Sequence, residues 1–593
     1  MELDKADAMD RRGIVPQLRV AVKGGRLFDA LGEVIRDWNL DIVAESLVDL
    51  NEADEVDVVA EFQQLKASAD YDFFLSRSVF ELALPRLVRC CTVEVMGCVQ
   101  HLVDEVDGDW LAGNTFNSFV EFCVQQPTRI EEAITIVFGD PDRYSHFLDR
   151  VIRAMGRIEL EDAVTRAIEF TEASHDGIRL SAYSAMAEIG YGDNSELALP
   201  VIDCLECRVS IEFEDRILGA IVSAIGHIRA TTEIDAGRSI SIMLKALDRG
   251  DANAVHWLVR YIEANADELD CEDLDLLLPR CGGISGEHHG TLTFLDSMLV
   301  KLASQDEVHT RIVELLEALL GEREEATPVE FGELKSFIGC LQSEQGRAVL
   351  RLLLTRWFMA GELEYCNCIT TVASGISNAA DWLEFDHDTA DLNVPIVCVY
   401  LARKSVGFLF GKPVIAAKLL LSLIELDLGE EADRDIGSLL LDPLLLNYSG
   451  ELGSYLRASI DEMPERSARV VREALEELDE YLRGLRSVDL PEVRPSVREV
   501  EWHMHIQNEQ FQDGYKRAFE DAWIQKFCKR TTLLYGRRST RMIDRGDDEC
   551  RFDLDLQHYE HEMEIPRLSM VAPIGLELQL RVFRGERWVA QCD

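Results

Sequence analysis

Apolar residues recur three and four positions apart along most of the chain from about residue 140, with short polar breaks between them. This spacing places the apolar side chains on one face of an α-helix. A phrase also recurs: VIRAMG begins at 151, AMAEIG at 185, IVSAIG at 221 and a degenerate WLVRYI at 257, so the phrases stand 34, 36 and 36 residues apart. The pattern predicts one repeated helical unit.

A second amphipathic helix lies between successive phrases, with apolar positions within 163–168, 199–205 and 240–247. Each repeat is therefore expected to be a helical hairpin. A hairpin of this size cannot bury its apolar face alone, so neighbouring hairpins must stack into a solenoid with an extended surface.

Glycines and caps suggest where these helices begin and end. Gly156, Gly190 and Gly226 close three of the phrases, and we expect them to adopt the left-handed conformation that ends a helix. Helix starts are expected at 128–131, at 140–141 and at 327–330, where an N-cap oxygen precedes a proline or is followed by a reciprocal acid.

The repeated phrases resemble the first helices of HEAT-like repeats, and Pro200 within a second helix is similar to the bent helices of that family. The resemblance covers about residues 140–320 and, in degenerate form, extends to about 450. It implies a protein-binding scaffold without intrinsic chemistry. The period is shorter than is usual for HEAT repeats and nearer that of tetratricopeptide repeats, but the tetratricopeptide aromatic pattern is missing.

The fold class predicted is mainly α, an α-solenoid with a small C-terminal α+β module. The expected organisation is an N-terminal helical region or cap at 1–110, the solenoid at 111–487, a linker at 488–499 and the module at 500–593. A long helix at 464–485 precedes the prolines at 491 and 495 that suggest the linker.

Alternating apolar and polar residues predict the strands of the C-terminal module. The alternation covers 500–506, 552–556 and 576–582, and a helix of about 509–530 is expected between the first two strands.

The charge balance narrows the choice of partners. The chain has 593 residues and 109 Asp and Glu against 60 Lys and Arg, a net charge of -49. Residues 501–593 hold 17 acids and 14 bases, which leaves -46 for residues 1–500. Such a surface repels phosphates and anionic lipid, so we expect no membrane and no nucleic acid for the solenoid, and a protein partner with a basic surface.

One basic segment interrupts this acidity. It carries Lys516, Arg517, Lys526, Lys529, Arg530, Tyr535, Arg537, Arg538, Arg541 and Arg545. Acids follow directly from 547, so the segment is interpreted as pairing locally or docking on the acidic solenoid. The alternative is an anion or nucleic-acid contact in which Tyr535 stacks on a base.

The histidines and cysteines of the chain could either ligate a metal ion or have purely structural roles. His503 and His505 would share one face of a strand, and His558 and His561 could add ligands. Solvent-facing histidines are the simpler interpretation. The pairs Cys204/Cys207, Cys366/Cys368 and Cys271/Cys281, the last with His288 and His289, match no recognised zinc spacing.

No catalytic residue and no cofactor are assigned. The favoured function is a non-enzymatic scaffold that forms part of a larger assembly. The alternatives are a polyanion mimic that blocks a nucleic-acid-binding protein, and a metal-dependent enzyme that uses the C-terminal module. A cytoplasmic location is expected, because the acidic N-terminus lacks an export signal and the 15 cysteines are scattered. The most hydrophobic stretch, 395–426, is interrupted by four bases, which argues against a spanning helix.

Overall fold

The structure is a computed structural model. It describes residues 14–22, 26–34, 39–67, 72–105, 112–192, 195–232, 235–321, 327–377, 383–487, 496–498, 501–502, 504–508, 512, 530–533, 538–545, 548–555 and 564–588. The chain divides into two compact units, Met1–Ser336 and Phe337–Asp593. This division is coarser than the four-part organisation that the sequence predicts, which stays a prediction.

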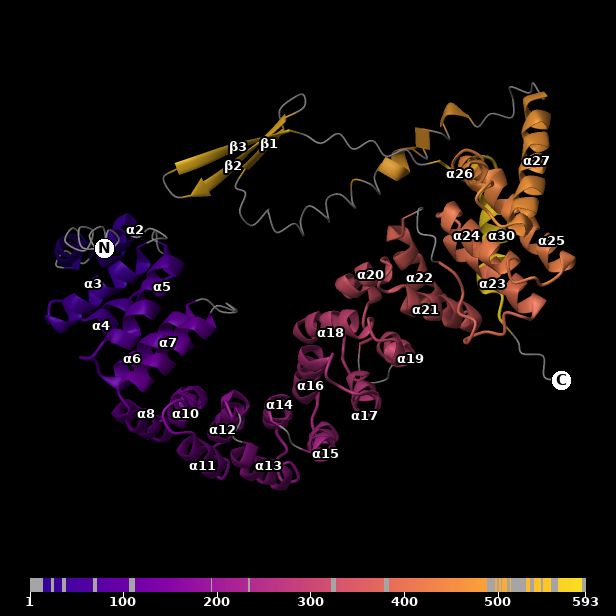
Figure 1. Ribbon diagram of the computed structural model, residues 1–593. Helices are drawn as coiled ribbons and strands as arrows, with labels where there is room; N and C mark the ends of the chain where they lie inside the picture. The colour runs from indigo at the N-terminus through magenta and orange to yellow at the C-terminus, as the bar shows by residue number, and fades with distance from the viewer. Residues whose placement is uncertain are drawn as a thin grey trace. The chain divides into compact units, whose positions relative to one another are not determined.

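Unit 1 contains two layers of helices (Figure 1). The inner layer is made of α10 (Leu148–Gly156), α12 (Asp176–Glu188), α14 (Asp215–Thr231), α16 (Ala252–Asn265) and α18 (His289–Leu302). The outer layer is made of α11 (Leu160–Phe170), α13 (Ser195–Arg208), α15 (Ala236–Leu247), α17 (Cys271–Cys281) and α19 (His309–Leu320). Each helix packs against the next helix of its own layer, and each also packs against a neighbouring helix of the other layer. This packing is that of an α-solenoid, as predicted.

The recurrent phrase supplies the core of the inner layer. Its first two positions are fully buried in three successive helices: Val151 and Ile152, Ala185 and Met186, Ile221 and Val222. In the degenerate phrase Leu258 is fully buried and Trp257 is half-buried. Equivalent positions in each repeat therefore meet in one continuous apolar seam, which is why the sequence repeats there.

The helices before α10 pack in the same way. They are α2 (Leu27–Val34), α3 (Leu40–Glu52), α4 (Val58–Phe62), α5 (Phe73–Ala83), α6 (Thr92–Asp104), α7 (Ala112–Gln125), α8 (Thr128–Gly139) and the short α9 (Pro141–Tyr144). Helix α6 packs on α8, and α7 packs on α10. Helices do begin at Thr128 and Pro141, as predicted, but the predicted caps are wrong. Thr128 is the first residue of α8 and not its N-cap, and Asp140 makes no side-chain capping bond. The start predicted at 327 is wrong, because Val329 donates its backbone N–H to Leu319 O (2.9 Å) and 327–330 is not helical.

The prediction of left-handed glycines is also wrong. Gly156 is the last residue of α10, Gly190 follows α12, and Gly226 lies inside α14, but the glycines described with a positive φ are Gly192, Gly361 and Gly429. Gly226 serves a different purpose, since a Cβ there would lie 2.7 Å from Cδ2 of Tyr261 on α16. Its missing side chain allows α14 and α16 to approach closely.

Unit 2 continues with helices α21 (Arg347–Ala360), α22 (Leu363–Gly375), α23 (Pro395–Leu409), α24 (Pro413–Ile424), α25 (Glu430–Leu439), α26 (Glu451–Ser459) and α27 (Glu465–Ser487). Helix α20 (Lys335–Leu341) begins at the division between the units, and a kinked segment, η5 (Leu440–Leu445), follows α25, with Asp442 in a non-helical conformation. Helices α23 and α24 are apolar on nearly every face, and both are buried. The hydrophobic stretch at 395–426 is therefore core.

Residues beyond 487 only partly follow the prediction. Three antiparallel strands in the order β1-β2-β3 are described: β1 (Arg530–Leu533), β2 (Arg538–Arg545) and β3 (Asp548–Asp555). Strand β3 contains the predicted positions 552 and 554. The strand predicted at 500–506 is wrong, because residues 501–502 and 504–508 are helical. The helix predicted at 509–530 lies almost entirely outside the described residues.

The strand predicted at 576–582 is also wrong, since it forms part of α30 (Pro573–Gly585), which follows the short α29 (Arg567–Val571). Leu576 and Leu580 are one helical turn apart and buried, whereas Leu578 and Val582 lie on the other face. A segment of seven alternating residues can fit either period, and packing on α23 selects the helix. The C-terminal α+β module is therefore not supported in the form predicted.

Polar groups hold the end of the chain on α23 (Figure 1). Lys404 is fully buried, and its Nζ donates to the backbone oxygens of Arg584 (2.7 Å) and Glu586 (2.6 Å). A Cβ on Gly407 would lie 3.0 Å from Cβ of Phe583. The C-terminal helix therefore completes the core of unit 2.

Candidate protein-binding surfaces

The basic segment predicted as a contact site is only partly described. Arg530 lies in β1, and Arg538, Arg541 and Arg545 lie in β2. The strand register places positions 538 and 545 opposite the aspartate positions 555 and 548. Positions 541 and 530 lie opposite Phe552 and Met542 instead. The other members, Lys516, Arg517, Lys526, Lys529, Tyr535 and Arg537, lie outside the described residues. Local pairing and an anion contact both stay predictions.

The histidines proposed as metal ligands are not brought together in the described part of the chain. His505 lies in the helical segment 504–508 and is exposed, and His503, His558 and His561 lie outside the described residues. Among the described residues, no group of three or more His, Cys, Asp or Glu could hold a metal ion.

The cysteines have mostly structural surroundings. Those that the structure describes are free thiols, and Cys281 and Cys366 are buried. Burial raises the pKa of each of these two thiols to about 12. Cys204 is half-buried and lies 3.6 Å from Oγ1 of Thr171, whereas Cys207 is exposed. Buried thiols of this kind are unreactive, because only the thiolate is nucleophilic.

A series of ion pairs links successive repeats along the outer layer. In each, an arginine of one repeat contacts a carboxylate of the preceding repeat: Arg166 with Glu131, Arg208 with Glu172, Arg238 with Asp203, Arg280 with Asp248 and Arg311 with Asp275. Exposed pairs of this kind add little stability, about 0–1 kcal/mol each. These pairs place the positive charge of each outer-layer arginine next to a carboxylate of the protein itself.

The charges of the two layers differ as a result. The five outer-layer helices hold 11 Asp and Glu against 6 Lys and Arg, and the five inner-layer helices hold 6 against 7. All six outer-layer bases already face carboxylates, so the outer-layer helices keep a surplus of acids over bases. The negative charge of these repeats therefore lies mainly on the outer-layer helices.

Exposed acids gather in unit 1 where α16 leads into α17 and where α19 begins. This acidic edge comprises Asp267, Glu268, Asp270, Glu272, Asp306 and Glu307, all of them exposed. Asp270 also caps α17, accepting from the backbone N–H of Asp273 (2.8 Å). Grouped charges of one sign attract a cationic surface over a Debye length of about 8–10 Å.

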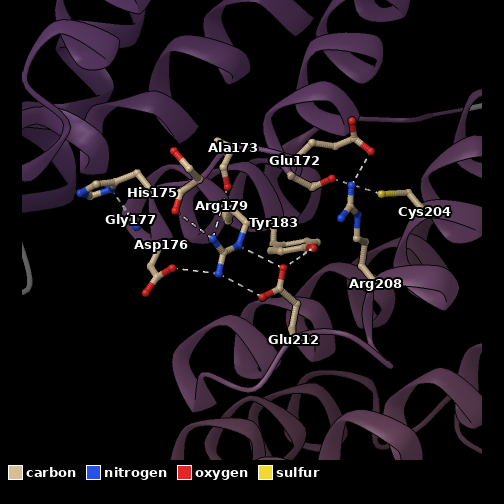
Figure 2. Close-up of polar contacts among 12 residues, drawn as sticks. Glu172, Ala173, His175, Asp176, Gly177, Arg179, Tyr183, Cys204, Arg208 and Glu212 are labelled. Carbon is tan, nitrogen blue, oxygen red and sulfur yellow. Dashed lines mark hydrogen bonds and ion pairs between the residues drawn. The ribbon is translucent and has the colours of Figure 1, made fainter.

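A buried polar network joins two successive repeats, and Figure 2 shows its part around Glu212 and Arg179. The carboxylate of Glu212, which is 6% exposed, accepts from Nε (3.2 Å) and Nη2 (3.3 Å) of Arg179 and from the hydroxyl of Tyr183 (3.1 Å). The backbone oxygen of Glu212 accepts from Nη2 of Arg249 (2.9 Å), which comes from the next repeat. Burial and Glu212 raise the pKa of Tyr183, so its hydroxyl stays a donor. The network fixes the turn between α13 and α14.

A groove of about 490 Å³ lies beside this network, and the arginines of Figure 2 line it. Ile211 and Phe213 project from the turn and are 58% and 80% exposed. The guanidinium of Arg249 lies 4.4 Å from the Phe213 ring centroid. Large apolar groups next to arginines are the composition that protein interfaces favour.

The inner layer carries an aromatic cluster on α16 and α18. The guanidinium of Arg260 lies 4.7 Å from the Trp257 ring centroid and 4.9 Å from that of Phe294. His256 lies edge-on to Phe294 and bonds Oγ1 of Thr291 (2.9 Å). Burial, with the charge of Arg260, lowers the pKa of His256, so this imidazole is neutral at pH 7. The cluster is a second composition suited to protein contact.

These layers and surfaces define the class of protein: an α-solenoid of HEAT-like helical hairpins. No protein-family model matches the chain, and no curated protein matches it. Among the described residues, no helix is both long and apolar enough to cross a membrane.

Solved structures offer distant likenesses. A crystal structure of importin beta is 12% identical, with 78% of this chain and 70% of that chain covered and a TM-score of 0.29. Kap121p bound to Ste12p is 10% identical, with 78% and 59% covered and a TM-score of 0.28. A circular tandem repeat protein is 16% identical, with 80% and 96% covered and a TM-score of 0.15. TM-scores this low do not establish a shared fold. The class assigned to this protein therefore rests on the stacking of its helical hairpins.

Sequence reasoning missed both the ion-pair series and the Glu212 network. The series does have a sequence signal, because partners such as Glu172 and Arg208 or Asp275 and Arg311 are 36 residues apart, one repeat length. The Glu212 network has no comparable signal, since its members come from helix and turn positions that only stacking brings together.

Proposed function

We propose that the protein is a non-enzymatic scaffold that binds a protein partner with a basic surface, as a subunit or regulator of a larger assembly in the cytoplasm. The observation that carries the proposal is the surplus of carboxylates on the outer layer and the acidic edge of unit 1, where the arginines already face acids of the preceding repeat. A cationic partner would meet carboxylates with few competing bases.

The stacked architecture supports the same proposal. A solenoid presents a long surface to which each repeat contributes side chains, and it does so without enclosing a reaction site. The groove beside Glu212 and the cluster around Arg260 would add apolar contacts and specificity to a charge-driven encounter.

The test begins with partners recovered from the native cell by pull-down and identified by mass spectrometry. Each partner is purified, and its Kd for the full chain is measured in 50 mM and 300 mM salt. We expect binding to weaken about 10-fold or more with salt, because complementary charges are screened. Duplex DNA competing for the same partner would instead indicate a polyanion mimic.

A matched pair of variants locates the surface. Asp267→Asn, Glu268→Gln and Glu272→Gln together remove three negative charges from the acidic edge and leave the Asp270 cap in place. The control, Glu476→Gln, Glu477→Gln and Glu480→Gln, removes three exposed charges from α27 in unit 2. We expect the first set to weaken binding and flatten its salt dependence, and the control to change both much less. Equal effects, or a Kd indifferent to salt, would refute the proposal.

A further inference from the structure

Helix α30 has two apolar faces, and the part of the chain that the structure describes covers only one of them. Leu576 and Leu580 are 5% and 4% exposed, and α30 packs on α23. The opposite face carries Ile574, Leu578 and Val582, which are 77%, 58% and 67% exposed. Residues four apart lie one above the other on a helix, so these three form a continuous stripe.

A further apolar residue near the stripe in sequence is Val571, at the end of α29, which is 58% exposed. The chain leaves the helical conformation at Ala572, so the stripe itself is made by the three residues of α30. Isolated exposed apolar residues are normal on protein surfaces, but an apolar row of this length is typical of a surface that another helix covers. We therefore expect another helix to pack on the exposed apolar stripe of α30.

The charges beside the stripe suggest which occupant fits. Arg581 Nε donates to Glu577 Oε1 (3.0 Å), and both residues flank the stripe on one side. Glu577 and Arg581 are placed symmetrically about residue 579, close to Leu578 at the centre of the stripe. In an antiparallel pair related by a two-fold axis near this point, Glu577 of one copy would lie opposite Arg581 of the other. The face is thus complementary to itself in both apolar pattern and charge.

We propose that α30 is a homodimer interface, with the stripes of two copies packed antiparallel about Leu578. This proposal is independent of the proposed function, because it uses neither the acidic edge nor the outer layer. A partner helix from another protein would satisfy the apolar stripe, but the symmetric placement of opposite charges favours a second copy of this chain.

The size and charge of the interface set its expected strength. Three or four apolar side chains per copy bury less than the roughly 1,200 Å² of a standard interface, so we expect a weak dimer with Kd on the order of 10–100 µM. Each chain also carries a net charge of -49, and two copies repel each other. Salt screens that repulsion, so dimerisation should strengthen with salt, whereas binding of a basic partner should weaken.

Sedimentation of the full chain from about 1 to 200 µM in 50 mM and 300 mM salt tests the proposal. We expect reversible dimers that become more abundant at the higher salt concentration. Leu578→Glu places two like charges at the two-fold axis and should leave the protein monomeric. Ile211→Glu is the matched control, since Ile211 is also 58% exposed but lies in unit 1, and dimers should persist.

A charge reversal gives the sharper test. Glu577→Arg and Arg581→Glu, each alone, set like charges opposite each other and should weaken the dimer at least 10-fold, whereas the double reversal should restore it. A protein that stays monomeric under all conditions would overturn the proposal. So would a Leu578→Glu variant that melts earlier without any change in dimer content, because the stripe would then be covered within the chain itself.

Discussion

Replacing Glu212 with glutamine should loosen the solenoid at one place. The substitution keeps the shape of the side chain but removes the charge that Arg179 contacts at 3.2 and 3.3 Å. Breaking a buried ion pair costs about 3–5 kcal/mol when the remaining charge is fully enclosed. Here the Arg179 side chain is 20% exposed and keeps Asp176 at 2.8 Å, so we expect a smaller loss of about 2 kcal/mol.

Hydrogen exchange is the suitable assay, because repeats contact only their neighbours and the loss should be local. A loss of about 2 kcal/mol corresponds to about 30-fold faster exchange. We expect this acceleration in α12 and α14 and little change in unit 2.

Glu172→Gln is the matched control. It breaks the neighbouring pair with Arg208, but its carboxylate is 73% exposed, so exchange should change by less than about 3-fold. Equal acceleration in the two variants, or none in Glu212→Gln, would refute the reasoning that burial makes the Glu212 network important.

Three other substitutions test buried features. Burial, opposed by Arg150, raises the pKa of the Asp149 carboxyl from 3.8 to about 6. The folded state therefore holds the carboxyl proton more tightly than the unfolded state does, so the free energy of unfolding should fall as pH rises from about 4 to 6. Urea unfolding of Asp149→Asn should show the difference from the parent chain growing in the variant's favour over that range. Gly226→Ala should destabilise by about 1–3 kcal/mol through overpacking, whereas Gly484→Ala, which meets nothing within 4 Å, should be neutral or stabilising in the same measurement. Lys404→Met should release the C-terminal segment, seen as faster cleavage there by protease, because the buried carbonyl oxygens lose their donor.

The repeated units could be predicted from the sequence because their apolar positions do the same work in each copy. Val151, Ile221 and their equivalents must all fill one seam, so stacking imposes a period on the sequence. The role of Gly226 could not be predicted this way. Helix-ending glycines and glycines that admit an aromatic ring look alike until the neighbouring helix, with Tyr261, is in place.

The distribution of charge between the two helix layers was harder to predict from the sequence. Net charge is a property of composition, but its assignment to a layer depends on which face each helix buries. The strand predicted at 576–582 was wrong for a related reason. The segment is too short for its hydrophobic period to distinguish a helix from a strand. Packing against α23 decides it, and α23 lies about 170 residues earlier in the chain.

The docking of α30 on α23 also has a consequence during synthesis. The ammonium of Lys404 finds its acceptors on residues 180 and 182 positions later. At the usual elongation rates of about 5–20 residues per second, α23 leaves the ribosome roughly 10–40 s before the segment that covers it. Throughout that interval a nascent chain would expose to water the apolar face of α23 that α30 later covers, and exposed apolar surface of this kind favours aggregation unless chaperones bind it.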